Sequence, residues 1–279
     1  LFIGLFLRHH NYDPSFFVLA GDKFSNPAQV PPNLTVLSPS DGFDGQFYYR
    51  LALDPFTVKQ TDFGITLDIP AYRSSRILYP LIVWLLSFGH AEAVPVLMIL
   101  VNYLAVCVIG GLAGMYARSL GRHALWGLLI AGYVGFFLTL ARDLTEIVAL
   151  AFLLASLVLL ARKHFLAAAI VLTVGVLARE TMLIWAGAVL ATWLAAKSLR
   201  KPYDVPAYYF IAPIVVYALW QIVLTFRWGE PALTLGSQQF GVPFGGLFPF
   251  VVKTLALSNH SQVVESIELV YLFLFAVAV

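Results

Sequence analysis

The run VPVLMILVNYLAVCVIGGLAGMY, residues 94–116, contains no charged side chain. Crossing the hydrocarbon core of a bilayer as an α-helix takes about 20 predominantly apolar residues. The run is long enough to do so, and it predicts a transmembrane helix. Further apolar runs on both sides repeat the pattern.

The composition of the whole chain agrees with this run. Of the 279 residues, 60% are hydrophobic and 11% are charged, and the mean hydropathy is +0.84. Soluble domains carry roughly 25% charged and about 45–50% apolar residues. One soluble core could not bury so much apolar surface, so lipid must surround most of it. A soluble enzyme, a disordered protein and a disulfide scaffold are excluded, and the long continuous runs are unlike β-barrel strands.

These runs predict an all-α polytopic membrane protein with about eight transmembrane helices. The apolar segments are 1–7, 94–116, 124–140, 144–161, 165–178, 182–196, 207–225 and 264–279. We expect residues 1–7 to end a first transmembrane helix, 8–93 to form a long extracytoplasmic loop with short surface or re-entrant helices, 94–225 to form the helix bundle, 226–263 a second extracytoplasmic loop and 264–279 a truncated transmembrane helix.

The charged residues predict the orientation in the membrane. Three connections carry seven basic residues opposed only by Asp204: Arg118, Arg122, Arg162, Lys163, Lys197, Arg200 and Lys201. Cytoplasmic loops are rich in Lys and Arg, so these connections are predicted to be cytoplasmic and residues 8–76 to lie outside the cell membrane. This topology requires the apolar segment 77–88 not to cross, and it is shorter than the about 17 residues that a span needs.

The densest polar stretch is SPSDGFDGQFYYR, residues 38–50. Asp44 is a suitable N-cap for a short helix over 45–53. A carboxylate held there by backbone N–H groups stays ionised, as a general base requires. The alternative is that Asp41 and Asp44 only form turns and caps.

Two further clusters combine arginines with acidic residues at the outer ends of predicted helices. Residues 142–146 read RDLTE and residues 179–181 read RET. Ionisable groups beside lipid tend to face a bundle interior or a water-filled cavity, so we predict a polar pocket roofed by residues 8–76. Acidic residues in a first helical turn also interact favourably with the helix dipole, which is the structural alternative.

The stretch DIPAYRSSR, residues 68–76, places two arginines directly before the short apolar segment. Guanidinium groups bind phosphate oxygens bidentately, so Arg73 and Arg76 suit a phosphate or pyrophosphate. Anchoring to lipid head groups explains the same residues. The histidines lack metal-ligand spacing and Cys107 stands alone, so no metal site is predicted. A net charge of +2 gives no nucleic-acid signal.

An aspartate-bearing first outer loop, short surface helices and a following bundle of spans resemble the layout of the C-fold (GT-C) membrane glycosyltransferases. These enzymes use polyprenyl-phosphate sugars. The residues Asp44-Gly45-Gln46-Phe47 resemble the Asp-Gly-x-x-Phe signature of bacterial relatives of the GPI-anchor mannosyltransferases. Residues 43–49, 70–80 and 142–146 are similar to a set found in bacterial members. The layout resembles the family over most of the chain, and the motifs do so over the first 80 residues and 142–146.

The resemblance implies an inverting hexosyl- or mannosyltransferase that moves a sugar from a polyprenyl-phosphate donor to an extracytoplasmic glycan or lipid acceptor. Asp44 would be the general base and Asp41 a second candidate. Phosphate and sugar binding would fall to Arg73, Arg76, Arg142, Asp143, Glu146, Arg179, Glu180 and Tyr48. A divalent cation is compatible with this chemistry, although no ligand set demands one. Partners would be the lipid-linked donor, the acceptor, membrane lipids and other membrane subunits. Two alternatives remain: a non-catalytic subunit of a larger membrane complex, and a lipid or oligosaccharide transporter.

Overall fold

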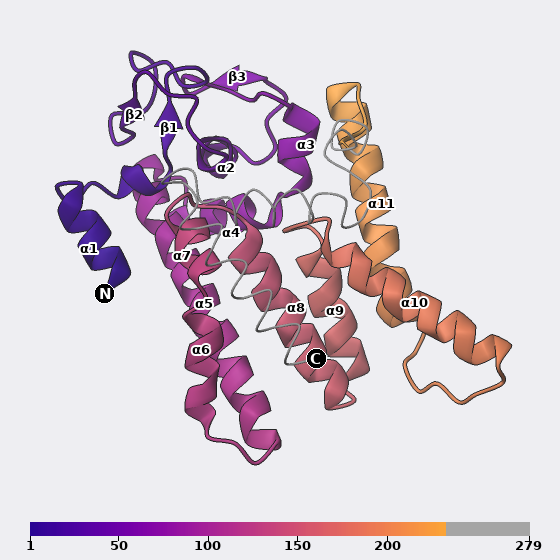
Figure 1. Cartoon of the computed structure of the whole chain (residues 1–279). Helices are drawn as coiled ribbons and strands as arrows, with labels where there is room; N and C mark the ends of the chain where they lie inside the picture. The colour runs from indigo at the N-terminus through magenta and orange to yellow at the C-terminus, as the bar shows by residue number, and fades with distance from the viewer. Residues whose placement is uncertain (233–279) are drawn as a thin grey trace, which may run out of the picture. The chain divides into compact units, whose positions relative to one another are not determined.

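The computed structural model describes residues 1–232, which are mostly helical with four very short strands (Figure 1). The helices are α1 (Phe2–His9), α2 (Gly45–Leu53), α3 (Pro70–Ser75), α4 (Leu78–Ser87), α5 (Val94–Ser119), α6 (Gly127–Ala131), α7 (Val134–Leu140), α8 (Glu146–Ala161), α9 (Phe165–Gly175), α10 (Met182–Ser198) and α11 (Tyr208–Trp228). Short 3₁₀ helices cover Pro14–Phe17, Ala91–Ala93 and Ala124–Trp126. The strands are β1 (Ala20–Gly21), β2 (Val36–Leu37), β3 (Thr61–Asp62) and β4 (Ile65–Thr66). The predicted helix 264–279 and most of the predicted loop 226–263 lie outside the described residues.

Residues 8–93, which we call the head segment, contain all four strands and three short helices. Strand β1 pairs in parallel with β2, and β3 pairs antiparallel with β4. Helix α2 packs against α4 and against β4. The predicted helix over 45–53 is confirmed by α2. In Figure 1 the strands, α2 and α3 lie at one end of helices α5, α8 and α9.

Both ends of helix α4 contact other parts of the head segment. Just before it, Arg76 Nη1 donates a hydrogen bond to the Tyr48 hydroxyl at 3.1 Å. Just after it, Asn33 Nδ2 donates to the carbonyl oxygens of Ala91 and Glu92 at 3.2 and 3.3 Å. The helix has 10 residues, which corresponds to about 15 Å at about 1.5 Å per residue. It therefore does not carry the chain to the far end of the bundle.

Two helices of the described residues are long and apolar enough to cross a membrane by length and composition. They are Ala91–Ser119, which includes α5, and Tyr208–Trp228, which is α11. In each, 33% of the most apolar stretch is buried, so most of its residues are not buried. Helices α8, α9 and α10 are also apolar, with 16, 11 and 17 residues. Helix α8 packs between α5 and α9, and α9 packs against α11.

The single helix predicted over 124–140 is wrong, because the chain breaks between α6 and α7. Tyr133, between them, is extended with φ −59° and ψ 128°. The backbone of α6 lies directly on α5: a Cβ on Gly127 would be 2.2 Å from the Gly110 carbonyl oxygen and 2.5 Å from the Gly114 nitrogen. Glycines one turn apart allow such a close crossing, and hydropathy carries no information about it.

The connections alternate between the two ends of the bundle. The carbonyl oxygen of Arg142 would be 2.4 Å from a Cβ on Gly45, and Leu78 N donates to the Leu177 carbonyl at 3.0 Å. Both connections before α8 and α10 therefore contact the head segment. The connections after α5, α8 and α10 lie at the other ends of these helices (Figure 1).

Candidate functional site

Asp44 stands where the head segment meets the connection between α7 and α8. The residues on either side of it both contact Arg142. The guanidinium carbon of Arg142 lies 4.3 Å from the centre of the Phe43 ring, and Gly45 allows the Arg142 backbone to approach. Asp44 and Arg142 are thus neighbours in space, although 98 positions separate them in the sequence.

The carboxylate of Asp44 pairs with Arg73 and does not cap α2. Asp44 has helical dihedral angles and its side chain makes no capping hydrogen bond, whereas a capping side chain sits on an extended backbone. Its Oδ2 atom instead lies 2.5 Å from Arg73 Nη1. The predicted capping hydrogen bond is therefore wrong, and an ion pair orients the carboxylate in its place. With 39% of its side chain exposed, Asp44 can still be reached from solvent.

Arg73, on α3, is shared between two carboxylates. Its Nε and Nη2 atoms donate to Asp68 at 2.8 and 2.7 Å, while Nη1 contacts Asp44. Its guanidinium also lies 4.5 Å from the centre of the Phe47 ring. Burial alone would lower the pKa of Arg73, but the hydrogen bonds to Asp68 and the charges of Asp68 and Asp44 raise it above its usual value. The group is a permanent cation whose charge is already neutralised.

Arg76 forms the second ion pair of the site. Its Nε and Nη2 atoms donate to Glu180 at 3.1 and 2.7 Å, and it also donates to the hydroxyls of Tyr48 and Tyr72. Burial opposes ionisation of Glu180, but the hydrogen bonds and charge of Arg76 hold the pKa of this carboxyl below its usual value. Tyr48, which accepts from Arg76, lies one helical turn after Asp44.

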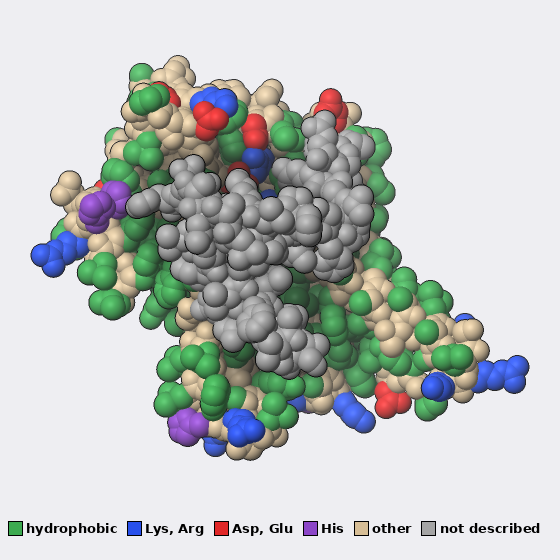
Figure 2. All heavy atoms as spheres, viewed as in Figure 1, with side chains coloured by type: hydrophobic (Ala, Val, Ile, Leu, Met, Phe, Trp, Pro, Cys, Tyr) green, Lys and Arg blue, Asp and Glu red, His purple; other side chains and the backbone are tan. Residues whose placement is uncertain are grey.

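The third ion pair joins Arg179 to Glu146. These two residues stand at the mouth of an open cavity of about 230 Å³ between α8 and the start of α10. Its wall is apolar and includes Leu150, Leu153 and Met182. The sequence predicted a polar pocket roofed by residues 8–76, but among the described residues no member of that segment lines this cavity. Figure 2 shows acidic and basic side chains close together at the head-segment end of the described residues.

Arg142 differs from the other three arginines of the site. Arg73, Arg76 and Arg179 each pair with a carboxylate, whereas Arg142 forms no ion pair with any carboxylate of residues 1–232. Its guanidinium lies against the face of the Phe43 ring. It is the arginine best placed to receive an anionic group next to Asp44.

Asp143 and Asp41 do not face this site as the sequence predicted. Asp143 is fully buried, and its Oδ2 atom has no hydrogen-bond partner. Its Oδ1 lies 3.4 Å from the Tyr79 hydroxyl, which itself donates to the Met98 carbonyl at 3.0 Å. Asp41 is exposed and pairs with Lys23 at 2.5 Å. A substrate-binding role for Asp143 and a catalytic role for Asp41 therefore lack support in this geometry.

Several residues of the site were not among the site residues predicted from the sequence. Asp68, Phe47 and Tyr72 lie against Arg73 on α3 and Arg76 just after it. Asn102 donates to the Tyr79 hydroxyl at 3.0 Å beneath Asp143. An amide inside a long apolar run is a usable signal for Asn102, because polar groups there tend to face the interior. Asp68 lies five residues before Arg73, in the same stretch 68–76.

Within residues 1–232, no group of three or more His, Cys, Asp or Glu side chains is arranged to hold a metal ion. Comparisons with protein-family models, with curated proteins and with solved structures found no match to this chain.

Proposed function

We propose that this chain is a multi-pass membrane glycosyltransferase of the inverting type. It would move a sugar from a polyprenyl-phosphate donor to an extracytoplasmic glycan or lipid acceptor. The observation that carries the proposal is that two different groups lie next to each other. Asp44 is partly exposed and ion-paired with Arg73, and the adjacent Arg142 has no carboxylate partner in residues 1–232. A base and an uncompensated cation side by side suit transfer from a phosphate leaving group.

The chemical step needs both groups. Asp44 accepts the proton of the acceptor hydroxyl. As it does so, the oxygen of that hydroxyl attacks the anomeric carbon of the donor. The bond between that carbon and the phosphate oxygen breaks, and polyprenyl phosphate leaves with both bonding electrons. Arg142 stabilises the negative charge that develops on this phosphate. Arg73 positions Asp44.

A membrane location with about eight spans is part of the proposal. Candidates are α1, α5, the α6–α7 pair, α8, α9, α10, α11 and the segment 264–279, which lies outside the described residues. The alternation of the connections supports it, since the basic connections after α5, α8 and α10 lie at the opposite end from the head segment. By the positive-inside rule the basic end would be cytoplasmic and the site extracytoplasmic.

The decisive experiment compares Asp44→Asn with Asp41→Asn. Membranes containing each variant are supplied with a polyprenyl-phosphate mannose, and release of polyprenyl phosphate is measured. Because positioned general-base catalysis contributes about 10²–10⁴-fold, Asp44→Asn should lose about that factor. Asp41→Asn is the matched control and should stay near the wild-type rate, since Asp41 is an exposed partner of Lys23. A wild-type rate for Asp44→Asn would remove Asp44 from the mechanism.

A non-catalytic subunit is the second candidate. The observation that favours it is that Arg73, Arg76 and Arg179 are each neutralised by a carboxylate of the chain, and the pair between Arg76 and Glu180 holds the head segment to the bundle without any ligand. A wild-type chain that releases no phosphate from any lipid-linked sugar, alone or with its co-purified partners, would favour this candidate.

A further inference from the structure

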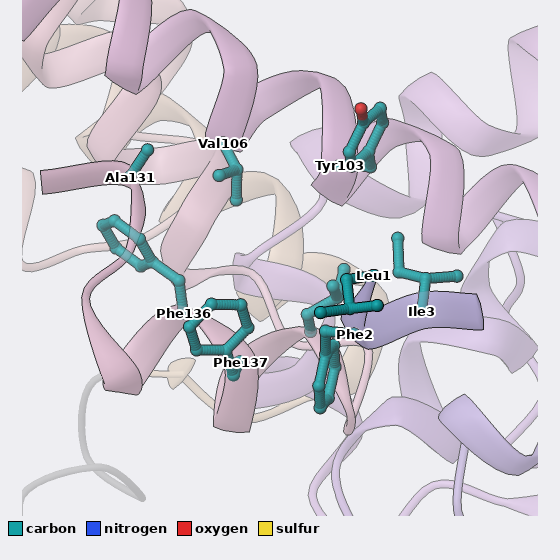
Figure 3. A pocket seen from close by; sticks show the side chains of 9 residues that line it. Leu1, Phe2, Ile3, Tyr103, Val106, Ala131, Phe136 and Phe137 are labelled. Atoms are coloured by element: carbon teal, nitrogen blue, oxygen red, sulfur yellow. The ribbon is translucent and has the colours of Figure 1, made fainter. Parts of the chain in front are cut away.

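Three cavities of the described residues differ in their charged lining. The cavity in Figure 3, of about 130 Å³, lies between α1, α5 and the α6–α7 pair and is lined by side chains without charge. The cavity at Glu146 and Arg179 belongs to the candidate site. The third, of about 520 Å³, lies between α5 and α6 and carries a single charged side chain, Arg122.

The walls of this third cavity are apolar and aromatic. Tyr116 near the end of α5 and Leu120 just after it form one side, and Trp126 and Leu129 form the other. These four side chains are exposed by 58–65% of their surface. An exposed patch of this kind, with a Trp and a Tyr at the end of an apolar helix, is typical of the boundary between lipid head groups and acyl chains.

The charge at the rim of the cavity is uncompensated. Arg122 forms no ion pair with any carboxylate of residues 1–232, and neither does the nearby Arg118. Figure 2 shows basic side chains at the lower edge of the view, where the connections after α5 and α8 lie. The cavity therefore offers a cation above a hydrocarbon-lined hollow.

We propose that this cavity binds an anionic phospholipid of the membrane leaflet at the basic end of the bundle. The phosphate pairs with Arg122, the glycerol region lies against Trp126 and Tyr116, and one acyl chain follows the wall formed by Leu120 and Leu129. Basic pockets between membrane helices recognise acidic lipid head groups in this way. The inference rests on the proposed membrane location and is independent of the proposed transferase activity.

The test measures lipid retention and no transfer reaction. The purified full chain in detergent is incubated with phosphatidylglycerol or with phosphatidylcholine of the same acyl chains, and bound lipids are counted by native mass spectrometry. The wild type should retain phosphatidylglycerol in preference. Arg122→Gln should weaken that retention about fivefold, the contribution of one basic side chain near an acidic lipid. Arg162→Gln, at the same end but outside the cavity, is the matched control and should change nothing.

Three outcomes would overturn the proposal. They are equal retention of the two lipids by the wild type, equal effects of Arg122→Gln and Arg162→Gln, and displacement of phosphatidylglycerol by an equal concentration of soluble glycerol phosphate, which would indicate an anion site without a lipid chain. Loss of retention in Trp126→Ala would support the contact between Trp126 and the glycerol region of the lipid.

Discussion

At the scale of single residues, the charges of the site mostly compensate one another, whereas the carboxyl of Asp143 is buried away from the site. Asp143 is fully buried and has no cation beside it among the described residues. The Tyr79 hydroxyl has one hydrogen, and the Met98 carbonyl takes it at the shorter distance of 3.0 Å. Burial accordingly raises the pKa of Asp143 well above its usual range, despite nearby Asn102 and Tyr79.

This raised pKa predicts the sign of a pH effect on stability. A carboxyl in the unfolded chain titrates near about pH 3.9, so the contribution of Asp143 to folding is complete below that pH. It is lost as the pH rises toward the higher pKa of the folded state. The asparagine of Asp143→Asn carries no charge at any pH. The free energy of unfolding of this variant should therefore rise relative to that of the wild type between pH 5 and 7, by up to about 1.4 kcal/mol per pH unit.

Unfolding midpoints of the detergent-solubilised variants at three pH values give the measurement. Asp41→Asn, which changes an exposed residue, provides the control. Its unfolding midpoint plotted against pH should run parallel to that of the wild type. Parallel curves for wild type and Asp143→Asn would show that Asp143 is ionised in the folded protein.

The residue types of the site could be predicted from sequence, but their pairings could not. The motif around Asp44, and Arg73 and Arg76, stood out because charges are rare in this chain. Which arginine stays available depends on contacts between positions far apart: Arg76 meets Glu180 and Arg73 meets Asp44. Local spacing cannot distinguish these arginines from Arg142, and it made Asp143 look similar to its exposed neighbours.

At the scale of elements, glycines decide how α5 and α6 meet. Hydropathy predicted both apolar runs but treated 124–140 as one helix. The contact of Gly127 with Gly110 and Gly114 is a backbone contact, and the pattern of apolar residues is blind to it. The short helix α2 was predictable because its turn and first residues lie together in the chain. The length of α4 was predictable from the short apolar run that forms it.

The crossing of α5 and α6 can be tested with two glycine substitutions. Gly127→Ala would place a Cβ 2.2 Å from the Gly110 carbonyl oxygen, so the helices must separate, at a cost of about 1–3 kcal/mol in the free energy of unfolding. Gly111→Ala meets nothing within 4 Å and should be neutral or slightly stabilising, since alanine favours a helix over glycine. Thermal unfolding of both variants compares them, and equal midpoints would contradict the close crossing.

At the scale of the whole described chain, the head segment returns to the end of the bundle from which it started. Asn33 contacts the chain after α4, and Tyr48 contacts the chain before it. The connections ahead of α8 and α10 come to the same end. Sequence reasoning anticipated this alternation from the basic connections, because charge asymmetry reports on topology without knowledge of packing.

Single cysteines test this arrangement in membranes. In a Cys107→Ser background, Lys59→Cys and Glu92→Cys are expected to react with a membrane-impermeant maleimide from outside intact cells. Arg162→Cys should react only after permeabilisation. All three native residues are exposed, so failure to react would reflect the membrane side. Labelling of Lys59→Cys and Glu92→Cys from opposite sides would mean that α4 crosses.

The ion pair between Arg76 and Glu180 joins residues 104 positions apart, and this separation has a consequence for biosynthesis. Ribosomes add about 5–20 residues per second, so Arg76 is added to the chain roughly 5–20 seconds before its partner Glu180. Until then its guanidinium must stay hydrated, because an unpaired charge is costly to bury. The head segment can therefore complete its interior only after the nascent chain has supplied the connection before α10.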